Sequence, residues 1–201
     1  MASKDRILRL KDETRVNILE AAFKIVKNEG WQALSMRKIA EEIEYTAPII
    51  YEYFANKEAI LEELNRKGFI LLTGKMQEAS DKATSTEDKL EAVWMAYWNF
   101  AFAEKELYQL MFGVSMNCCS QQKGPEIAGP TNLVNDLISK LTQGVEGIDE
   151  QESEICRWYY TYWSIVHGLI SINLTNRGTS DRLNRRILQD TIRGITKAII
   201  A

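Results

Sequence analysis

Apolar residues recur at intervals of three and four positions along most of this chain, the spacing that places them on one face of an α-helix. Segments with this spacing predict helices over about residues 12–28, 56–81, 88–104, 107–112, 131–143, 150–176 and 181–201. Glycines, two prolines and many polar residues predict mostly loop over residues 113–130. The chain is therefore predicted to be all-α.

The stretch from residue 35 to 57 predicts two short helices joined by a tight turn, followed by the start of a longer helix. The small side chain of Ala40 suits the steep crossing found in a helix-turn-helix. The second short helix has about two turns and is too short to hold in water without packing. The apolar positions of the pair are Ile39, Ala40 and Ile43, then Ile50, Tyr51 and Phe54.

Side chains that accept hydrogen bonds from free backbone N–H groups precede several of these helices. Ser35 and Thr46 are placed to cap the two short helices, and Asn56 is placed to cap the longer one. Thr84 and Glu87 have the spacing of a capping box before the helix over 88–104. These caps set the expected helix starts.

The outward positions of the second short helix are small, apolar or aromatic, which is unusual for a face left to solvent. They are Thr46, Ala47, Pro48, Ile49 and Tyr53. This composition predicts that the face contacts a partner.

With 201 residues, 45% of them hydrophobic, and three prolines, the chain can bury a sizeable core as one large domain or two smaller ones. The net charge of −3 does not indicate a nucleic-acid-binding protein as a whole, so any basic surface must be local. Basic residues near the N-terminus form either a flexible arm that tracks phosphates or a frayed, solvated end. They are Lys4, Arg6, Arg9, Lys11 and Arg15.

The three cysteines, Cys118, Cys119 and Cys156, form no even disulfide framework, and no Cys or His spacing matches a zinc site. No signal peptide or long apolar run is present, so we predict a cytoplasmic protein with no membrane partner, metal or cofactor. The adjacent Cys118 and Cys119 leave a thiol-based redox response open, although ordinary thiols are the commoner case.

Residues 15–61 resemble the N-terminal module of the TetR (tetracycline-repressor-like) transcriptional regulators. Many members have glycine at the turn position occupied here by Glu44. A positive φ there would cost glutamate about 1 kcal/mol, so the turn is expected to differ slightly in shape. Pro48 is a second departure, tolerated near the start of a helix. The resemblance rests on Ala21-Ala22, Gly30 before an aromatic residue, Ile39-Ala40 and the string Tyr51-x-x-Phe54-x-x-Lys57-Glu58.

The resemblance implies a DNA-binding helix-turn-helix domain over residues 1–57. Arg37 would reach a phosphate or a guanine edge. Lys57 would attract phosphate together with the free N–H groups of its helix start. Tyr51 and Tyr53 would aim hydroxyls at phosphates, although Tyr51 is also a core candidate. The implied DNA-binding residues are Ser35, Arg37, Thr46, Ala47, Pro48, Ile49, Tyr51, Tyr53 and Lys57.

Residues 58–201 would then form a helical-bundle domain for effector binding and dimerisation. The last two helices carry more apolar surface than one body can use, which predicts a four-helix interface in a homodimer. The string Trp163-x-x-x-His167-Gly168 also resembles a C-terminal TetR subtype built around a Trp…His-Gly motif. Its Trp and His share one helix face, and Gly168 would let helices approach closely.

Aromatic residues are numerous in this C-terminal part, where they form either a packed core or the wall of a ligand cavity. Tyrosine hydroxyls, Asn99 or His167 would be the few polar groups of such a cavity, although a lone histidine is more often a core or interface residue. The resemblance favours a small, often hydrophobic effector. The candidate effector-binding residues are Trp94, Tyr97, Trp98, Phe102, Met111, Phe112, Tyr159, Tyr162, Trp163 and His167.

Together these features predict a homodimeric repressor that binds a palindromic operator in double-stranded DNA and is released by a hydrophobic or aromatic effector. Activation with the same parts is the other possible direction. An enzyme is poorly supported, because no nucleophile elbow, phosphate loop or metal spacing is present, and no catalytic residue is predicted. A helical protein–protein interaction module would account for the C-terminal half, but not for Arg37, Tyr53 and Lys57.

Overall fold

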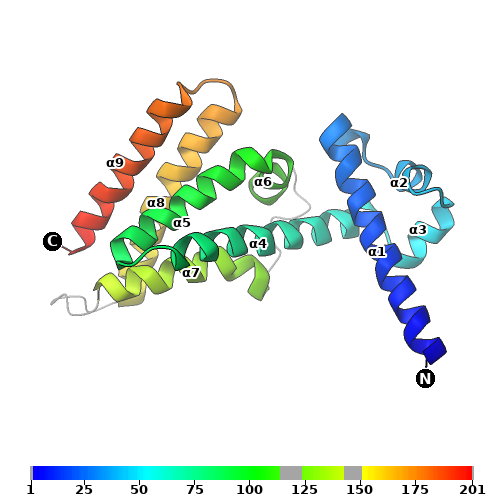
Figure 1. The fold of residues 1–201 in the computed structure, drawn as a ribbon. Helices are drawn as coiled ribbons and strands as arrows, with labels where there is room; N and C mark the ends of the chain where they lie inside the picture. The colour runs from blue at the N-terminus through cyan, green and yellow to red at the C-terminus, as the bar shows by residue number, and fades with distance from the viewer. Residues whose placement is uncertain (1, 114–123, 143–150, 201) are drawn as a thin grey trace. The chain divides into compact units, whose positions relative to one another are not determined.

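The computed structural model describes residues 2–113, 124–142 and 151–200 (Figure 1). This part of the chain contains no strand, which confirms the predicted all-α class. A single 3-10 turn, Trp31–Ala33, follows the first helix. The α-helices are α1 (Ala2–Glu29), α2 (Met36–Glu42), α3 (Ala47–Tyr53), α4 (Lys57–Asp81), α5 (Thr86–Ala103), α6 (Lys105–Phe112), α7 (Pro125–Thr142), α8 (Gln151–Leu174) and α9 (Asp181–Ile200).

Two predicted helix boundaries are wrong. Helix α1 begins at Ala2, so residues 2–11 are helical turns and not a flexible arm, with Asp5 in the first turn where its charge favours the helix dipole. Helix α7 begins at Pro125, inside the predicted loop. Proline is tolerated at the first helical position because its missing N–H would have had no partner there.

The other part of that predicted loop cannot be compared with the fold. Cys118 and Cys119 lie outside the described residues, so a thiol-based redox response remains a prediction. Cys156 is exposed on α8.

The chain packs into two compact units. The head unit consists of Met1–Gly68 with Glu106–Gln122, and the body unit of Phe69–Lys105 with Lys123–Ala201. Helix α4 contributes residues to both units, and nearly all of α6 belongs to the head unit although it follows α5 in sequence. The predicted division after residue 57 concerns function and stays a prediction.

The core of the head unit is formed by the apolar faces of α1 to α4. Ala22 and Ala40 are fully buried, and α1 packs on α2, which packs on α3. Leu110 of α6 belongs to the same cluster. This packing holds the two-turn helix α3, which could not persist alone. Other buried members of this core are Ile18, Leu19, Ile25, Val26, Ile39, Ile50, Phe54, Ile60, Leu61 and Leu64.

The turn between α2 and α3 retains a left-handed residue. Glu44 has a φ of 58°, and the N–H of Tyr45 donates to the Ala40 carbonyl at 2.9 Å. Glu44 thus adopts the left-handed conformation that was expected to be costly for a glutamate at this position. Glutamate bears the left-handed backbone at a cost of about 1 kcal/mol, which the packing of α2 against α3 offsets.

Two of the three predicted caps of the head unit form. Ser35 Oγ accepts from the N–H of Lys38 at 3.2 Å, and Asn56 Oδ1 accepts from the N–H of Ala59 at 2.8 Å. Thr46 precedes α3, but its side chain accepts no capping hydrogen bond. Its hydroxyl is therefore not committed to the helix start.

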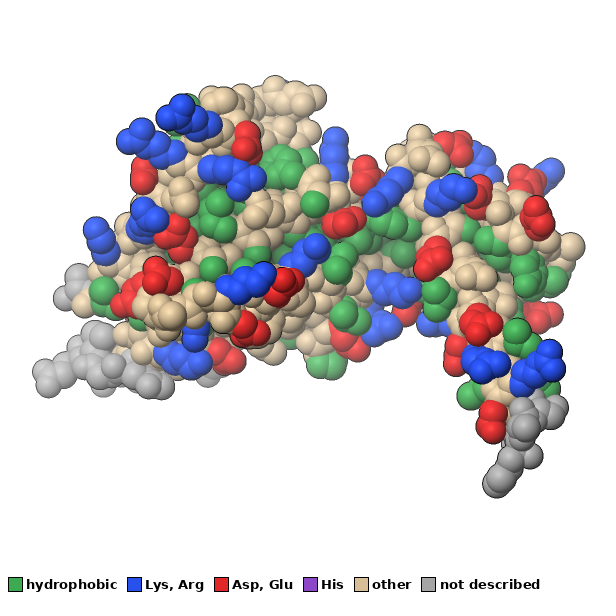
Figure 2. Space-filling view, in the orientation of Figure 1, with side chains coloured by type: hydrophobic (Ala, Val, Ile, Leu, Met, Phe, Trp, Pro, Cys, Tyr) green, Lys and Arg blue, Asp and Glu red, His purple; other side chains and the backbone are tan. Residues whose placement is uncertain are grey.

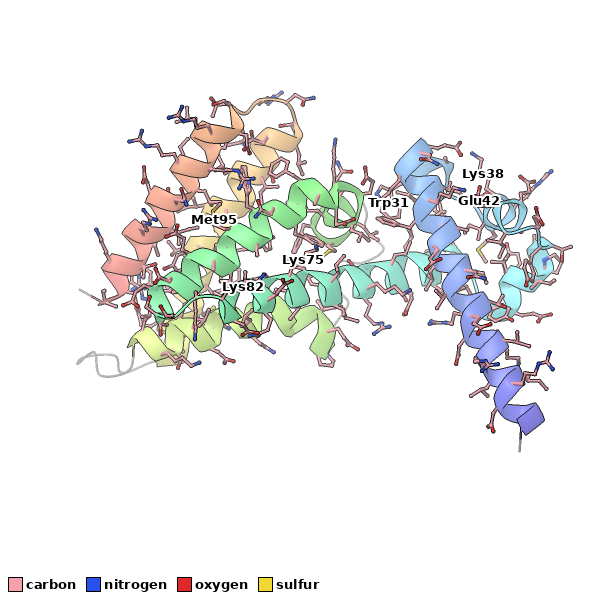
Figure 3. All side chains as sticks on the ribbon, viewed as in Figure 1. Trp31, Lys38, Glu42, Lys75, Lys82 and Met95 are labelled. Atoms are coloured by element: carbon pink, nitrogen blue, oxygen red, sulfur yellow. The ribbon has the colours of Figure 1, made fainter. Side chains whose placement is uncertain are left out.

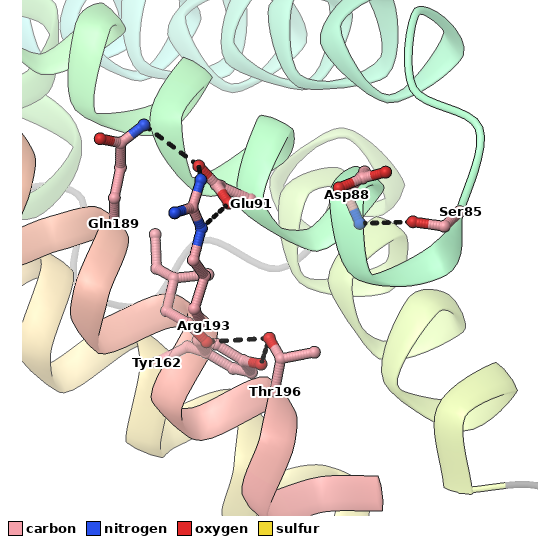
Figure 4. Close-up of polar contacts among 8 residues, drawn as sticks. Ser85, Asp88, Glu91, Tyr162, Gln189, Arg193 and Thr196 are labelled. Atoms are coloured by element: carbon pink, nitrogen blue, oxygen red, sulfur yellow. Dashed lines mark hydrogen bonds and ion pairs between the residues drawn. The ribbon is translucent and has the colours of Figure 1, made fainter.

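The predicted capping box before α5 is displaced by one residue. Ser85 Oγ accepts from the N–H of Asp88 at 3.0 Å, so Ser85 and not Thr84 caps the helix (Figure 4). The helix begins at Thr86, and a side-chain cap reaches the N–H three residues ahead.

In the body unit, α5 packs on α7, α8 and α9. No helix of the described ranges is long and apolar enough to cross a membrane. Nor do three or more His, Cys, Asp or Glu side chains come together as a metal site among those residues.

Candidate functional site

The outer surface of the helix-turn-helix carries the residues implicated in DNA binding. Arg37 is among the most exposed, at 86% of its side chain, and donates to Glu41 of the same helix at 2.9 Å. Thr46 and Pro48 are exposed, whereas Ala47 and Ile49 are half-buried. Such a surface offers one exposed cation together with small and apolar groups, the chemistry that suits a base edge or a thymine methyl.

The two tyrosines of α3 differ in exposure. Tyr51 is 54% exposed, so its placement among the inward apolar positions is wrong. Ile50 and Phe54 are four residues apart and take the core face, which turns Tyr51 away by roughly 100°. Tyr53 is half-buried against the head core. The hydroxyl of Tyr51 is thus the more accessible to a partner.

Lys57 is tied to the head unit. It begins α4 and is half-buried, and its Nζ donates to the carbonyl oxygen of Trp31 at 3.3 Å. A phosphate would have to share or replace this contact. Ser35, engaged as the cap of α2, likewise already has a structural role.

Several other cations of the head unit are paired with carboxylates. Lys38 of α2 pairs with Glu29 of α1, and Glu42 of α2 pairs with Lys24 of α1, so two ion pairs join these helices. Lys38 and Glu42 are labelled on α2 in Figure 3. Figure 2 accordingly shows Lys and Arg interspersed with Asp and Glu on the visible surface of this unit. The head unit is not a uniformly basic body, and its attraction for phosphate must be local.

One ion pair that the sequence did not indicate joins α1 to α4. Glu63 accepts from Arg66 at 2.8 Å and from Arg15 at 3.3 Å. The Arg66 guanidinium, helped by Arg15, holds the pKa of the Glu63 carboxyl below its usual value. Arg15 also lies over the Phe54 ring at 4.9 Å, so this predicted arm residue is engaged within the head unit.

The body unit brings together six of the ten candidate effector residues. Trp94 stacks on Tyr162 with ring centroids 5.7 Å apart, and Tyr97 and Tyr159 lie 5.6 and 6.3 Å away. The other two members join this group from α8. Trp163 Nε1 donates to Tyr97 Oη at 3.2 Å, and the Trp163 ring stacks on His167 at 4.8 Å.

The remaining four candidates are placed differently. Trp98 is buried and packs against Phe102, which is 41% exposed. Met111 and Phe112 belong to the head unit, where Met111 lies against Gly68. Asn99, a possible polar group of the cavity, is exposed. Whether each of these binds an effector stays a prediction.

Burial changes the titration of three groups in this cluster. It raises the pKa of the Tyr159 hydroxyl, against the opposing effect of the hydrogen bond with Thr131. It lowers the pKa of His167 and favours the neutral imidazole. It raises the pKa of Tyr162 to about 12, against the opposing effect of the hydrogen bond with Thr196. The site is therefore electrically neutral at physiological pH.

Tyr162 gives a testable pH dependence. An unfolded tyrosine ionises near pH 10, so the folded state loses stability as the pH rises from about 10 to 12, by roughly 2–3 kcal/mol in total. Urea unfolding at pH 9 and at pH 11.5 measures this loss. The Tyr162→Phe variant should lose markedly less over the same interval, and an equal loss in both proteins would contradict the assignment.

A polar clamp between α5 and α9 is a second feature that sequence reasoning missed. Glu91 accepts from Arg193 at 2.7 Å and from Gln189 at 3.1 Å (Figure 4). Below it, Tyr162 and Thr196 are joined at 2.7 Å. Glu91 is about a hundred residues from Gln189 and Arg193 in the chain, and no local pattern could have revealed these contacts.

Helices α8 and α9 each carry an exposed apolar stripe. On α9 the positions Leu183, Ile187, Gly194 and Ala198 share a face that is distinct from the buried one. On α8, Ile165 and Ile172 are exposed and lie along the same line as Gly168. A Cβ built on Gly168 or Gly194 would meet nothing within 4 Å, so both positions are open to an approaching helix.

Comparison with known proteins places these features in a family. Residues 18–64 match the profile described as bacterial regulatory proteins, tetR family, and residues 90–193 match the profile of the tetracyclin repressor-like C-terminal domain. The chain is 29% identical to the HTH-type transcriptional activator FasR of Mycolicibacterium smegmatis over 165 residues, which cover 82% of this chain and 70% of FasR.

Two further relatives extend the comparison. The HTH-type transcriptional repressor KstR2 of the same species is 32% identical over 82 residues, or 41% of this chain and 40% of KstR2. A solved structure from Rhodococcus sp. RHA1, of a protein of unknown function, superposes with a TM-score of 0.75 at 20% identity, covering 93% of this chain and 95% of that one. At this identity the likeness concerns the fold alone. None of these matches tests the Trp…His-Gly subtype, which stays a prediction.

Proposed function

Because this chain belongs to the TetR family of bacterial transcriptional regulators, with a DNA-binding domain and a ligand-binding C-terminal domain, we propose that it is a homodimeric repressor of a palindromic operator. Its family consists of transcription regulators and not of enzymes. Among the named relatives FasR is an activator and KstR2 a repressor, so repression is the direction we propose and activation is its alternative. Action on DNA would place the protein in the cytoplasm.

The observation that carries this proposal is the outer face of α2 and α3. Arg37 and Tyr51 are exposed to solvent, the hydroxyl of Thr46 makes no capping hydrogen bond, and the buried Ile50 anchors the helix in the core. A short helix presented in this way can enter the major groove. Its apolar groups would contact thymine methyls, and Arg37 would contact a guanine edge or a phosphate.

Dimerisation would supply the second half-site. The exposed stripes of α8 and α9 offer apolar and small side chains to the same surface of a second copy, as a twofold interface requires. Two recognition helices would then lie in successive major grooves about 34–36 Å apart.

Release would follow from binding of an effector in the body unit. Helix α4 contributes residues to both units. A displacement of this helix caused by the effector would therefore also move its residues in the head unit. An effector that prefers the non-binding conformation by about 10⁴-fold would switch the population almost completely. The neutral aromatic cluster around Trp94 supports a hydrophobic or aromatic effector.

Selection from a random pool of DNA duplexes with the full chain tests the proposal. We expect enrichment of an inverted repeat, and an affinity for it that falls by about 10³–10⁵ between 50 and 200 mM salt if six to ten phosphates are contacted. Fluorescence anisotropy of the labelled repeat measures both. Enrichment of no repeat, or binding without salt dependence, would reject a DNA-binding function.

A further inference from the structure

Two buried indole N–H groups on α5 have no hydrogen-bond acceptor. Trp94 and Trp98 are each 1% exposed, and Nε1 of each lacks a partner within the described part of the chain. They stand four residues apart, so they occupy the same face of α5 on successive turns. Buried indoles usually find an acceptor, because an unpaired donor loses its hydration without compensation. Both indole N–H groups would therefore be stabilised by an added hydrogen-bond acceptor.

The polar groups of the aromatic cluster around Trp94 are satisfied, which makes the two indoles distinct. The indole of Trp31 in the head unit also lacks an acceptor, so one unpaired indole does not mark a site. Two on one helix face do, since Trp94 lies in the aromatic cluster and Trp98, one turn further along α5, packs against Phe102. The bonds that satisfy the neighbours join Trp163 Nε1 to Tyr97 Oη at 3.2 Å, Tyr159 Oη to Thr131 Oγ1 at 2.9 Å and Tyr162 Oη to Thr196 Oγ1 at 2.7 Å.

The interior of the body unit offers no positive charge to accompany these donors. Its fully buried polar residues, among those described, are Ser80, Thr142, Asn184 and Thr196. The one histidine, His167, is held towards its neutral form by burial. A carboxylate or phosphate placed beside the indoles would lack a counter-ion and would lose its hydration. An uncharged acceptor suffers no such penalty.

We propose that the effector presents an uncharged hydrogen-bond acceptor, such as the carbonyl oxygen of a ketone, ester or amide, to Nε1 of Trp94 and Trp98. A carbonyl oxygen has two lone pairs, so an effector with one or two carbonyl groups can supply the acceptors. The apolar remainder of the effector packs against the rings of Tyr97 and Tyr162. This inference rests on the proposed function, whose effector it describes, and it excludes free acids and phosphates from the class.

Three probes with the same ring and a similar chain test the chemistry. Butyrophenone carries a carbonyl, butylbenzene carries no polar group, and 4-phenylbutyrate carries a carboxylate. Two recovered hydrogen bonds give butyrophenone an affinity about 10- to 30-fold above that of butylbenzene, with 4-phenylbutyrate the weakest. In spectra of protein labelled with 15N-tryptophan, the indole signals of Trp94 and Trp98 shift downfield with butyrophenone and not with butylbenzene.

Replacing the indole nitrogen tests the two proposed hydrogen bonds directly. Benzothienylalanine at positions 94 and 98 keeps the ring shape and removes both N–H groups. The ratio of the affinities for butyrophenone and butylbenzene should therefore fall to about one. The same replacement at Trp158, which lies under Arg157 on α8, is the matched control and retains the preference. Thermal unfolding checks that each variant is folded.

Four results would overturn the inference: equal affinity for ketone and hydrocarbon, tightest binding of the carboxylate, no binding of any probe, or an unchanged preference in the 94/98 variant. A persistent cross-peak between these indoles and water in the presence of butyrophenone would assign them to a structural water instead. Binding of the selected operator is measured in the same samples. A protein that binds DNA but prefers the carboxylate retains the proposed function and loses only this effector class.

Discussion

Replacing Arg37 with alanine is expected to lower the affinity for the selected operator by about 30-fold or more, because each dimer loses two contacts of roughly 1–3 kcal/mol. The fold should be unaffected. The side chain is 86% exposed, and its partner Glu41 is four residues away on the same helix, an arrangement that stabilises by only about 0.3–0.5 kcal/mol. Anisotropy with labelled operator gives the affinity, and thermal unfolding gives the stability.

The salt dependence then identifies what Arg37 contacts. If it binds a phosphate, the slope of log affinity against log salt falls by about two per dimer. If it binds a guanine edge, the slope changes little and the preference at one base pair of each half-site is relaxed. Both outcomes keep Arg37 in the interface.

The control is another exposed cation in a matching pair. Lys82 after α4 is 72% exposed and pairs with Glu78 at the same spacing of four residues. The Lys82→Ala variant removes the same charge from the body unit, away from the stripes of α8 and α9, and should retain the affinity of the unmodified protein within about twofold. An equal loss in both variants would mean that Arg37 acts only through net charge.

The substitution Gly194→Leu is expected to dissociate the dimer while stabilising the subunit. The added side chain meets nothing within 4 Å in the monomer, and an exposed helical glycine costs about 0.5–1 kcal/mol relative to a better helix former. In a twofold interface the new side chain appears twice, and overpacking costs about 1–3 kcal/mol at each site. The dimer dissociation constant should therefore rise by roughly 30-fold to 10⁴-fold.

Sedimentation equilibrium measures the association, and thermal unfolding at low protein concentration measures the subunit. Gly74→Leu on α4 is the matched control, because Gly74 is also exposed on a helix with open space around its Cα. It should raise the subunit stability equally without changing the dissociation constant. If Gly194→Leu leaves the dimer intact, the stripe of α9 is not the interface.

These experiments depend on which side chains are exposed, and the sequence predicted this correctly at some positions and wrongly at others. The cap at Ser35 and the buried Ala40 followed from spacing, because both effects act within one or two turns. Tyr51 did not, since a helix of two turns is too short for its apolar pattern to define one face. Its orientation became evident only once Ile50 and Phe54 were seen in the core.

Interactions between distant parts of the chain could not be predicted from the sequence pattern either. The clamp of Glu91 with Arg193, the pairing of Glu63 with Arg15 and the inclusion of Leu110 in the head core join residues roughly 50 to 100 positions apart. No periodicity records such neighbours. The candidate effector residues were recognised as aromatic from the sequence, but which polar atoms among them remain unpaired depends on the packing.

By itself, the sequence determined the all-α class, the helix-turn-helix and the apolar stripes of the last two helices, because periodicity, capping and side-chain size act along a single helix. The tertiary structure alone decided which arginines stay exposed, that α6 packs with the head unit, and that two indoles on α5 lack acceptors. Those properties depend on which helices become neighbours, and that is settled when the helices pack together and exclude water.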